Sequence, residues 1–328
     1  MGANMFRAIK SLVLAFWAAS LGGVALAQDF PKRAVTIVVP FAAGGGGDIL
    51  ARMAVQRLET KWGVPVVVEN KPGAGGNIGA SAVARATPDG YTLLLAGSPQ
   101  FAVNVTLFKS LPYDPVHDFI PIAMAAATPF VLVVNPNVPA KSVAEFVSYA
   151  KAQAQPLNYA TAGYGVPHHL YMELLKSMTG VKMTPVPYRG SAPALSDVVA
   201  GHIPAMFVDL GPGLGQMQAG AVRPLGSSMA KRLEALPDVP PINETLPGFD
   251  VASWQMYAAP AGTPRDIIMK LNADLRSVLD QPQMKEQVSK SGMLPLEPGS
   301  VEQLQAFMKS EIARWGDVVR KAGIEGSQ

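Results

Sequence analysis

"VVPFAAGGGGDILAR", residues 38–52, runs from an apolar stretch through four consecutive glycines into a segment with helical periodicity. We predict a buried strand over 34–41, followed by a helix on which Leu50, Ala54 and Leu58 share one face. Four glycines lose much backbone entropy on folding, so the loop that contains them must have a use. A strand, a bare loop and a helix start together present backbone N–H groups and the positive end of a helix dipole, which suits an anion.

A nucleotide phosphate fits this loop poorly. A P-loop needs Gly-Lys-Ser/Thr after its glycines, whereas Gly47 is followed by Asp48-Ile49-Leu50. The dinucleotide pattern G-x-G-x-x-G would need a third glycine where Ile49 stands, although Glu69 lies near the required acidic position. A carboxylate would meet the same donors without these requirements. We expect Asp48 to cap the helix, with a direct contact to a substrate amine as the alternative.

Strands and helices alternate beyond the loop. "VPVVVEN" (64–70), the glycine-rich turn "KPGAGGNIGA" (71–80) and "PDGYTLLLAG" (88–97) continue the pattern, which predicts an α/β fold with a parallel sheet and helices on both faces. The proline-rich "LPYDPVHDFIPIA" (111–123) interrupts it, because proline is excluded from helix interiors. A second α/β block begins at "FVLVV" (130–134).

A second glycine loop, "TAGYGVPHH" (161–169), repeats the arrangement in the second block. Pro167 is well placed as the first residue of a helix that Gly180 closes. Two such helix starts, facing each other across a cleft, would suit the two ends of a diacid. Glycine loops are also common at strand–helix joints of α/β proteins, so neither loop alone identifies a ligand.

Composition excludes several classes of site. The 328 residues are 49% hydrophobic and 16% charged, which indicates about two globular domains. The absence of cysteine excludes disulfides, thiolate metal sites and cysteine nucleophiles. His168 and His169 are adjacent, so on a helix they point in different directions, and no His/Asp/Glu cluster has metal-ligand spacing. With no G-x-S-x-G elbow either, we expect no enzyme activity, metal or cofactor.

The N-terminus has the pattern of a secretory signal peptide over 1–27. Arg7 and Lys10 precede an apolar core, and the sequence ALA at 25–27 predicts cleavage before Gln28. A retained membrane anchor is the alternative. Cleavage would remove two positive charges and lower the formal charge from +3 to +1. The basic isoelectric point therefore does not indicate nucleic-acid binding.

Six segments taken together resemble one family. The chain is similar, over 30–323, to the tripartite tricarboxylate transporter substrate-binding receptors, also called Bug receptors. The segments are TIVVPFAAGGGGDILAR, VVVENKPGAGGNIGA, PDGYTLLLA, LPYDPVHDFIPIA, VPYRG and WQMYAAPAGTPRDIIMKLN. The resemblance implies a two-lobed periplasmic binding-protein (Venus-flytrap) fold. It also implies a monomeric periplasmic receptor that captures an organic carboxylate, such as a dicarboxylate, and delivers it to small and large membrane permease subunits.

The proline-rich break and a change of pattern near 250 suggest two lobes, and the resemblance assigns the C-terminus to the first. We predict lobe 1 as 28–126 plus 251–328 and lobe 2 as 127–250. The family often has a small hydroxyl residue where Val166 and Pro167 stand, which leaves room here for a larger or more apolar ligand.

The resemblance also implies which residues bind the ligand. They come from the first loop, the second loop, the loop after the third strand and one strand end: Phe41, Ala42, Ala43, Gly44, Gly45, Gly46, Gly47 and Asp48; Thr161, Ala162, Gly163, Tyr164, Gly165, Val166 and His168; Gly97, Ser98, Pro99 and Gln100; and Asp209. Two rival functions are a small-acid enzyme built on a binding-protein fold and a sensory or scaffold receptor that passes its ligand to a signalling partner.

Overall fold

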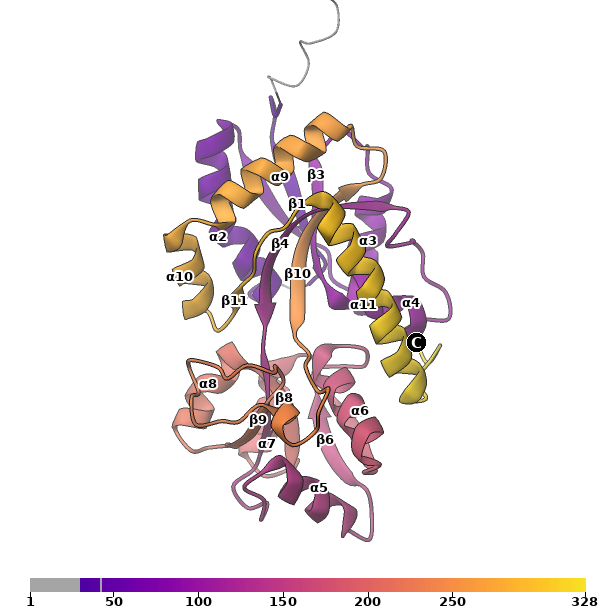
Figure 1. Cartoon of the computed structure of the whole chain (residues 1–328), viewed down its shortest axis with the longest axis vertical. Coiled ribbons are helices and arrows are strands. Elements are labelled where there is room, and N and C mark those ends of the chain that lie inside the picture. Colours follow the sequence, from indigo (N-terminus) through magenta and orange to yellow (C-terminus); the bar gives the residue numbers. More distant parts are fainter. Residues whose placement is uncertain (1–29, 42) are drawn as a thin grey trace, which may run out of the picture.

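The computed structural model describes residues 30–41 and 43–328, which form two lobes stacked along the long axis of the molecule (Figure 1). The predicted signal peptide, 1–27, lies outside the described residues. Each lobe contains one β-sheet flanked by helices, which confirms the predicted two-lobed α/β class. No helix in the described part of the chain is long and apolar enough to cross a membrane.

The first sheet is mixed. Its six strands are β1 (Val35–Val39), β2 (Val66–Asn70), β3 (Thr92–Gly97), β4 (Phe119–Thr128), β10 (Ser253–Pro260) and β11 (Leu294–Pro295), in the order β11-β4-β10-β3-β1-β2. Strand β1 pairs in parallel with β2 and β3, whereas β10 is antiparallel to β3 and β4. The prediction of a parallel sheet is therefore wrong for two strands of this sheet. Strand β10 returns from the other lobe and enters the sheet in the opposite direction, and β11 is antiparallel to β4.

Helices cover both faces of this sheet, as predicted. Ile37 of β1 belongs to the core cluster formed with α2 and α9, whereas its neighbour Val38 points to the opposite face and packs in the cluster that includes residues of α3 and α11. The helices of this lobe are α2 (Gly46–Trp62), α3 (Asn77–Ala84), α4 (Asn104–Leu107), α9 (Arg265–Leu279), α10 (Pro282–Lys290) and α11 (Val301–Lys321), with short turns η2 (Ala74–Gly76) and η3 (Pro99–Val103).

The second sheet has five strands in the order β7-β6-β8-β5-β9. Strand β6 is parallel to β7 and β8, and β5 runs antiparallel to β8 and β9. The elements of this lobe are β5 (Phe130–Val134), β6 (Leu157–Thr161), β7 (Met183–Pro187), β8 (Ala205–Asp209), β9 (Arg223–Ser227), α5 (Val143–Lys151), α6 (Pro167–Thr179), α7 (Ser191–Val199), α8 (Leu210–Gln218) and the short η4 (Ile242–Glu244).

Between residues 43 and 328 the chain crosses from one lobe to the other twice. Only Pro129 separates β4 from β5, and the chain returns just before β10. Helix α11 also reaches the second lobe, where the Trp315 ring stacks on Tyr171 with their centroids 6.0 Å apart. The lobe boundaries at 126/127 and 250/251 stay a prediction.

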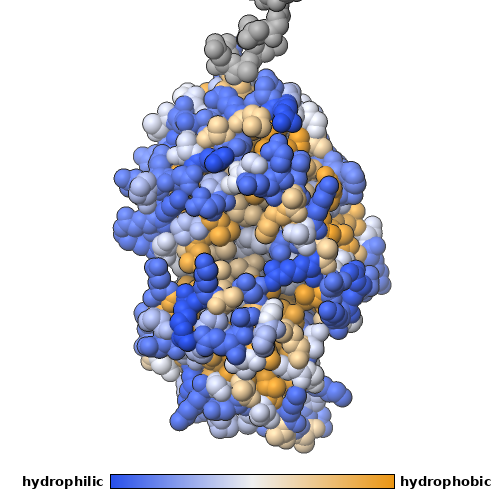
Figure 2. Space-filling view, viewed as in Figure 1, coloured by the Kyte–Doolittle hydropathy of each residue, from blue (hydrophilic) through white to orange (hydrophobic). Residues whose placement is uncertain are grey.

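The face shown in Figure 2 is mostly hydrophilic, with small and separate apolar patches.

Candidate functional site

A cavity of about 420 Å³ lies between the two sheets. This volume is in the range of small-molecule sites. Its walls come from both lobes: the start of α2, the turn at 72–76 and β10 on one side, and the start of α6 and the end of β8 on the other. Among the described residues that line it, only Asp209 and His168 carry ionisable side chains. A ligand anion would therefore have to be held mainly by neutral donors.

The first glycine loop supplies such donors at the start of α2. Gly45 is the N-cap in an extended conformation, and no described residue accepts a hydrogen bond from the backbone N–H of Gly47 or Asp48. These are the groups that a helix start leaves without intrahelical partners, and the helix dipole adds positive potential there. Gly45, Gly46 and Gly47 line the cavity, so the free N–H of Gly47 belongs to a residue of its wall.

Asp48, in the first turn of α2, binds the backbone of the loop through its side chain. Its Oδ2 accepts from Gly44 N at 2.9 Å, and its Oδ1 accepts from Arg52 Nε at 2.9 Å. The hydrogen bond from Arg52 holds the pKa of Asp48 below its ordinary value, although burial opposes this. The expectation that Asp48 caps α2 is wrong in position, because Gly45 is the N-cap and Asp48 is the third helical residue. Asp48 is also absent from the cavity wall.

We expect Asp48→Asn to leave the affinity for a carboxylate within about threefold of wild type, because an asparagine oxygen still accepts from Gly44 N. Asp48→Leu removes that acceptor and should weaken binding about tenfold, or roughly 1.4 kcal/mol. Calorimetric titration of both variants with adipate measures the difference. Equal and large losses in the two variants would mean that the charge of Asp48, and not its hydrogen bond to the loop, matters.

The second glycine-rich turn also reaches the cavity. Gly73, Gly75 and Gly76 line it, and all three have positive φ, at 122°, 64° and 88°. Gln100 is fully buried and holds this turn: its Nε2 donates to Gly75 O at 2.7 Å, and its Oε1 accepts from Gly97 N at 3.1 Å. Gln100 thus supports the wall and does not line it.

Gln255 is an unpaired polar side chain beside the start of α2. It lies on β10, is 7% exposed and lines the cavity, and its Oε1 has no hydrogen-bond partner among the described residues. A Cβ added to Gly47 would lie 3.3 Å from this oxygen. Buried amides are normally hydrogen-bonded, so an orphaned one in a cavity wall indicates a ligand contact.

The opposite wall carries Asp209, Ser191 and His168. Ser191 Oγ donates to Asp209 Oδ1 at 2.5 Å, and His168 Nε2 lies 3.1 Å from the same oxygen. Burial alone would raise the pKa of Asp209, but the hydrogen bonds and charge of its partners hold it below its ordinary value. In a nucleophile–base–acid relay the imidazole stands between serine and carboxylate. Here the serine bonds directly to the carboxylate, and His168 Nδ1 is buried without a partner among the described residues.

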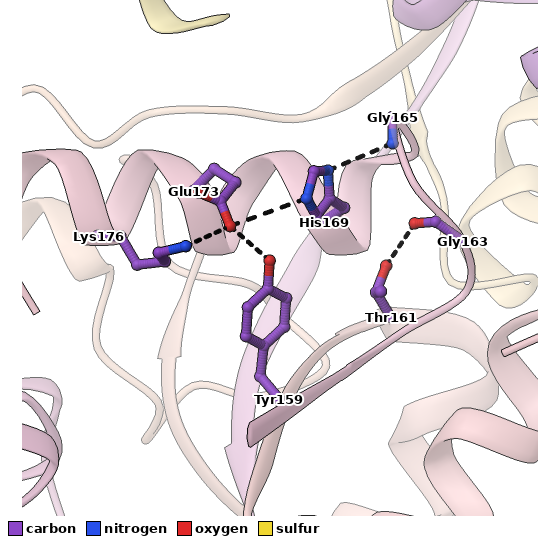
Figure 3. Close-up of polar contacts among 7 residues, drawn as sticks. All are labelled: Tyr159, Thr161, Gly163, Gly165, His169, Glu173 and Lys176. Atoms are coloured by element: carbon purple, nitrogen blue, oxygen red, sulfur yellow. Dashed lines mark hydrogen bonds and ion pairs between the residues drawn. The ribbon is translucent and has the colours of Figure 1, made fainter. Parts of the chain in front are cut away.

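Several polar groups of the second glycine loop are hydrogen-bonded to residues of the same lobe. Thr161 Oγ1 donates to Gly163 O at 2.7 Å, and Gly165 N donates to His169 Nδ1 at 3.3 Å (Figure 3). Pro167 has no N–H, and His169 N already bonds to Val166 O. The start of α6 is therefore poorer in free donors than the start of α2.

The cavity wall contains part of the predicted set. The predicted residues that line it are Phe41, Gly45, Gly46, Gly47, Gly97, Pro99, Ala162, Val166, His168 and Asp209. The predicted residues that do not line it are Ala43, Gly44, Asp48, Ser98, Gln100, Thr161, Gly163, Tyr164 and Gly165, and Ala42 lies outside the described residues.

Sequence reasoning missed about half of the wall: Pro40, Pro72, Gly73, Gly75, Gly76, Thr128, Phe130, Pro167, Ser191, Ser253 and Gln255. The turn "KPGAGGNIGA" carried a usable signal, because it is a second glycine cluster directly after a strand. A glutamine inside the apolar stretch 253–260 was another. Within the described ranges, no group of three or more His, Cys, Asp or Glu residues could hold a metal ion.

The chain is similar to known proteins over nearly its whole length. Protein BugT of Bordetella pertussis is 33% identical over 322 residues, which cover 98% of each chain. An R. palustris protein solved with adipate is 38% identical with a TM-score of 0.83, and the match covers 90% of this chain and 99% of that one.

MatC from Rhodopseudomonas palustris, solved with bound malate, is 36% identical with a TM-score of 0.79, over 88% of this chain and 100% of that one. Residues 50–324 match the family described as tripartite tricarboxylate transporter family receptor. The chain therefore belongs to the tripartite tricarboxylate transporter receptor family.

Proposed function

We propose that this protein is a periplasmic receptor that captures an organic carboxylate between its lobes, with a dicarboxylate as the first candidate. The observation that carries the proposal is the free N–H group of Gly47, at the wall of a cavity whose described lining contains no lysine or arginine, with the free N–H of Asp48 next to it in the chain. Charge-assisted bonds from such preorganised donors bind a carboxylate strongly. The adipate and malate bound by similar proteins support this ligand class.

A matched ligand series tests the proposal. Adipate, hexanoate and 1,6-hexanediol share a six-carbon chain and carry two, one and no carboxylates. We expect adipate to give the largest rise in Tm, hexanoate a smaller one and the diol none, because a ligand that binds only the native state raises Tm. A diol that stabilises the protein as well as adipate, or a series without any effect, would contradict the proposal.

An amino-bearing carboxylate is a second candidate ligand. The observation that favours it is Asp209, a carboxylate with a lowered pKa on the cavity wall. An ionised carboxylate attracts an ammonium group and repels a second ligand carboxylate. 6-Aminohexanoate, added to the same series, decides between the two: stronger stabilisation by the amino acid than by adipate would favour the second candidate.

We propose delivery to a permease with small and large membrane subunits as the physiological role. The family supports this partner, and a receptor that signals instead of transporting is the alternative. Deleting this chain from its cells should abolish high-affinity uptake of the best ligand in the series. Unchanged uptake, with loss of a transcriptional response to the ligand, would favour the sensory role.

Export with cleavage before Gln28 is part of the proposal. Intact-mass analysis of the periplasmic fraction should show a chain that begins at Gln28, because the n-region, apolar core and ALA sequence form one signal-peptide pattern. A periplasmic species that retains Met1 would contradict cleavage.

A further inference from the structure

His169 is a buried histidine behind the second glycine loop. It lies on α6, two residues after Pro167, and its side chain is 5% exposed. Its ring lies between Gly165 of the loop and Glu173 of α6 (Figure 3). It does not line the cavity, so any role in binding has to act through the loop.

The hydrogen bond from Gly165 fixes the protonation of this ring. Gly165 N donates to His169 Nδ1 at 3.3 Å, so Nδ1 must carry a lone pair. The neutral ring then carries its proton on Nε2, which lies 3.8 Å from Glu173 Oε1. A proton added to Nδ1 would face the N–H of Gly165 and end the hydrogen bond.

Four titratable groups face His169. On α6 these are Glu173 and Lys176, which form an ion pair at 2.7 Å. Tyr159 of β6 stacks on the imidazole and donates its hydroxyl to Glu173 Oε1 at 2.6 Å, and the Tyr164 ring meets the imidazole edge-on. Because Lys176 and Tyr159 already bind Glu173, that carboxylate has little left to stabilise a protonated His169.

Burial is the main cause that lowers the pKa of His169, and Lys176 acts in the same direction, while Glu173 opposes them. A His whose pKa is lowered by folding is held neutral by the native structure. The stability that it contributes is complete above the unfolded value of 6.5 and is lost as the pH falls through the lower native pKa.

Gly165 is packed closely against the other lobe. Its φ is +73°, and a Cβ at this position would collide with the side chain of Leu107 at the end of α4, in the other lobe. Ala162 and Val166, on either side of it in the loop, line the cavity. The loop is thus held by α6 through His169 at the point where it also meets the first lobe.

We propose that neutral His169 is a positioning residue for ligand binding: it holds Gly165 and thereby the loop 162–166, whose two ends line the cavity, and its protonation releases the loop and the ligand. This inference rests on the proposed carboxylate-binding function. It assigns to His169 a role that acts only through the backbone of the loop.

Two near-isosteric variants separate the acceptor from the ring. In His169→Asn, the amide oxygen stands at the same number of bonds from the backbone as Nδ1 and does not titrate. His169→Leu has a similar shape and no acceptor. In a calorimetric titration with adipate from about pH 8 to about pH 5, the affinity of the wild type should stay unchanged at high pH. It should fall at least about tenfold as the pH drops through the native pKa of His169, which lies below 6.5.

At high pH we expect His169→Asn to bind within about threefold of wild type and His169→Leu to bind about tenfold more weakly. Both variants should lack the part of the pH profile that depends on His169, and His168, still present in both, is thereby controlled. Equal weakening in the two variants, or an unchanged pH profile in His169→Asn, would overturn the proposal.

A second measurement needs no ligand. The amide ¹⁵N shift of Gly165 should follow the titration of His169 in the wild type and stay flat in His169→Asn. If adipate and the other carboxylates fail to bind, the proposed function is wrong, while this shift still decides whether His169 holds the loop. A Gly165 amide that does not respond to the titration would overturn the inference by itself.

Discussion

Gly47→Val is expected to reduce the affinity for adipate at least about a hundredfold, or roughly 2.7 kcal/mol. Gly47 is the second residue of α2 and lines the cavity, where its N–H is free. An added Cβ would lie 3.3 Å from both Gln255 Oε1 and Phe41 Cδ2, and the two methyl groups of valine would extend beyond it. The variant therefore fills the place where we expect the ligand carboxylate, without removing any side chain.

Gly215→Val is the matched control. Gly215 also lies in a helix, α8, where an added Cβ would meet nothing within 4 Å, and it does not line the cavity. Both variants replace a helical glycine with valine and so restrict the backbone in the same way. The difference between their adipate affinities, measured by calorimetry, therefore reports on the site. Similar affinities for Gly47→Val and the control would exclude the start of α2 as the carboxylate site.

Gln100→Leu is expected to lower the free energy of unfolding by about 2 kcal/mol and the affinity for adipate about tenfold. The side chain of Gln100 is fully buried, and its loss leaves Gly97 N without its acceptor. Gly75 O keeps a longer bond, at 3.3 Å, from Asn104 Nδ2. The glycine turn at 73–76, which lines the cavity, would lose its main attachment to the end of β3.

Denaturant unfolding and calorimetry measure these two effects. Gln56→Leu, at an exposed position of α2, makes the same chemical change away from the cavity and should alter neither quantity noticeably. A Gln100→Leu variant with normal stability but no adipate binding would instead identify Gln100 as a direct ligand contact, as the family resemblance implied.

The sequence predicted the parts of the fold that depend on local pattern. The strand over 34–41, the glycine loop and the face formed by Leu50, Ala54 and Leu58 all follow from residue type and spacing, and the structure confirms them. The direction of β10 did not follow, because it depends on which lobe the chain comes from. No local pattern around 253–260 records that.

In the site, too, the sequence predicted what depends on local pattern and not what depends on the arrangement of distant elements. Glycine clusters marked the loops, but not which glycines turn the backbone: φ is +81° at Gly44, +138° at Gly163 and −76° at Gly45. The cluster of His168, Ser191 and Asp209 joins three elements far apart in sequence, so nothing in spacing could predict it. The family resemblance placed Asp48 at the ligand, yet its carboxylate accepts hydrogen bonds from Gly44 and Arg52.

The central claim is that backbone donors at the start of α2 hold the ligand carboxylate. A crystal structure of the mature protein with adipate tests it most directly. The account predicts a carboxylate oxygen about 2.7–2.9 Å from the backbone nitrogen of Gly47 or Asp48, between the lobes. Adipate bound outside this cavity, or with both carboxylates away from the start of α2, would contradict it.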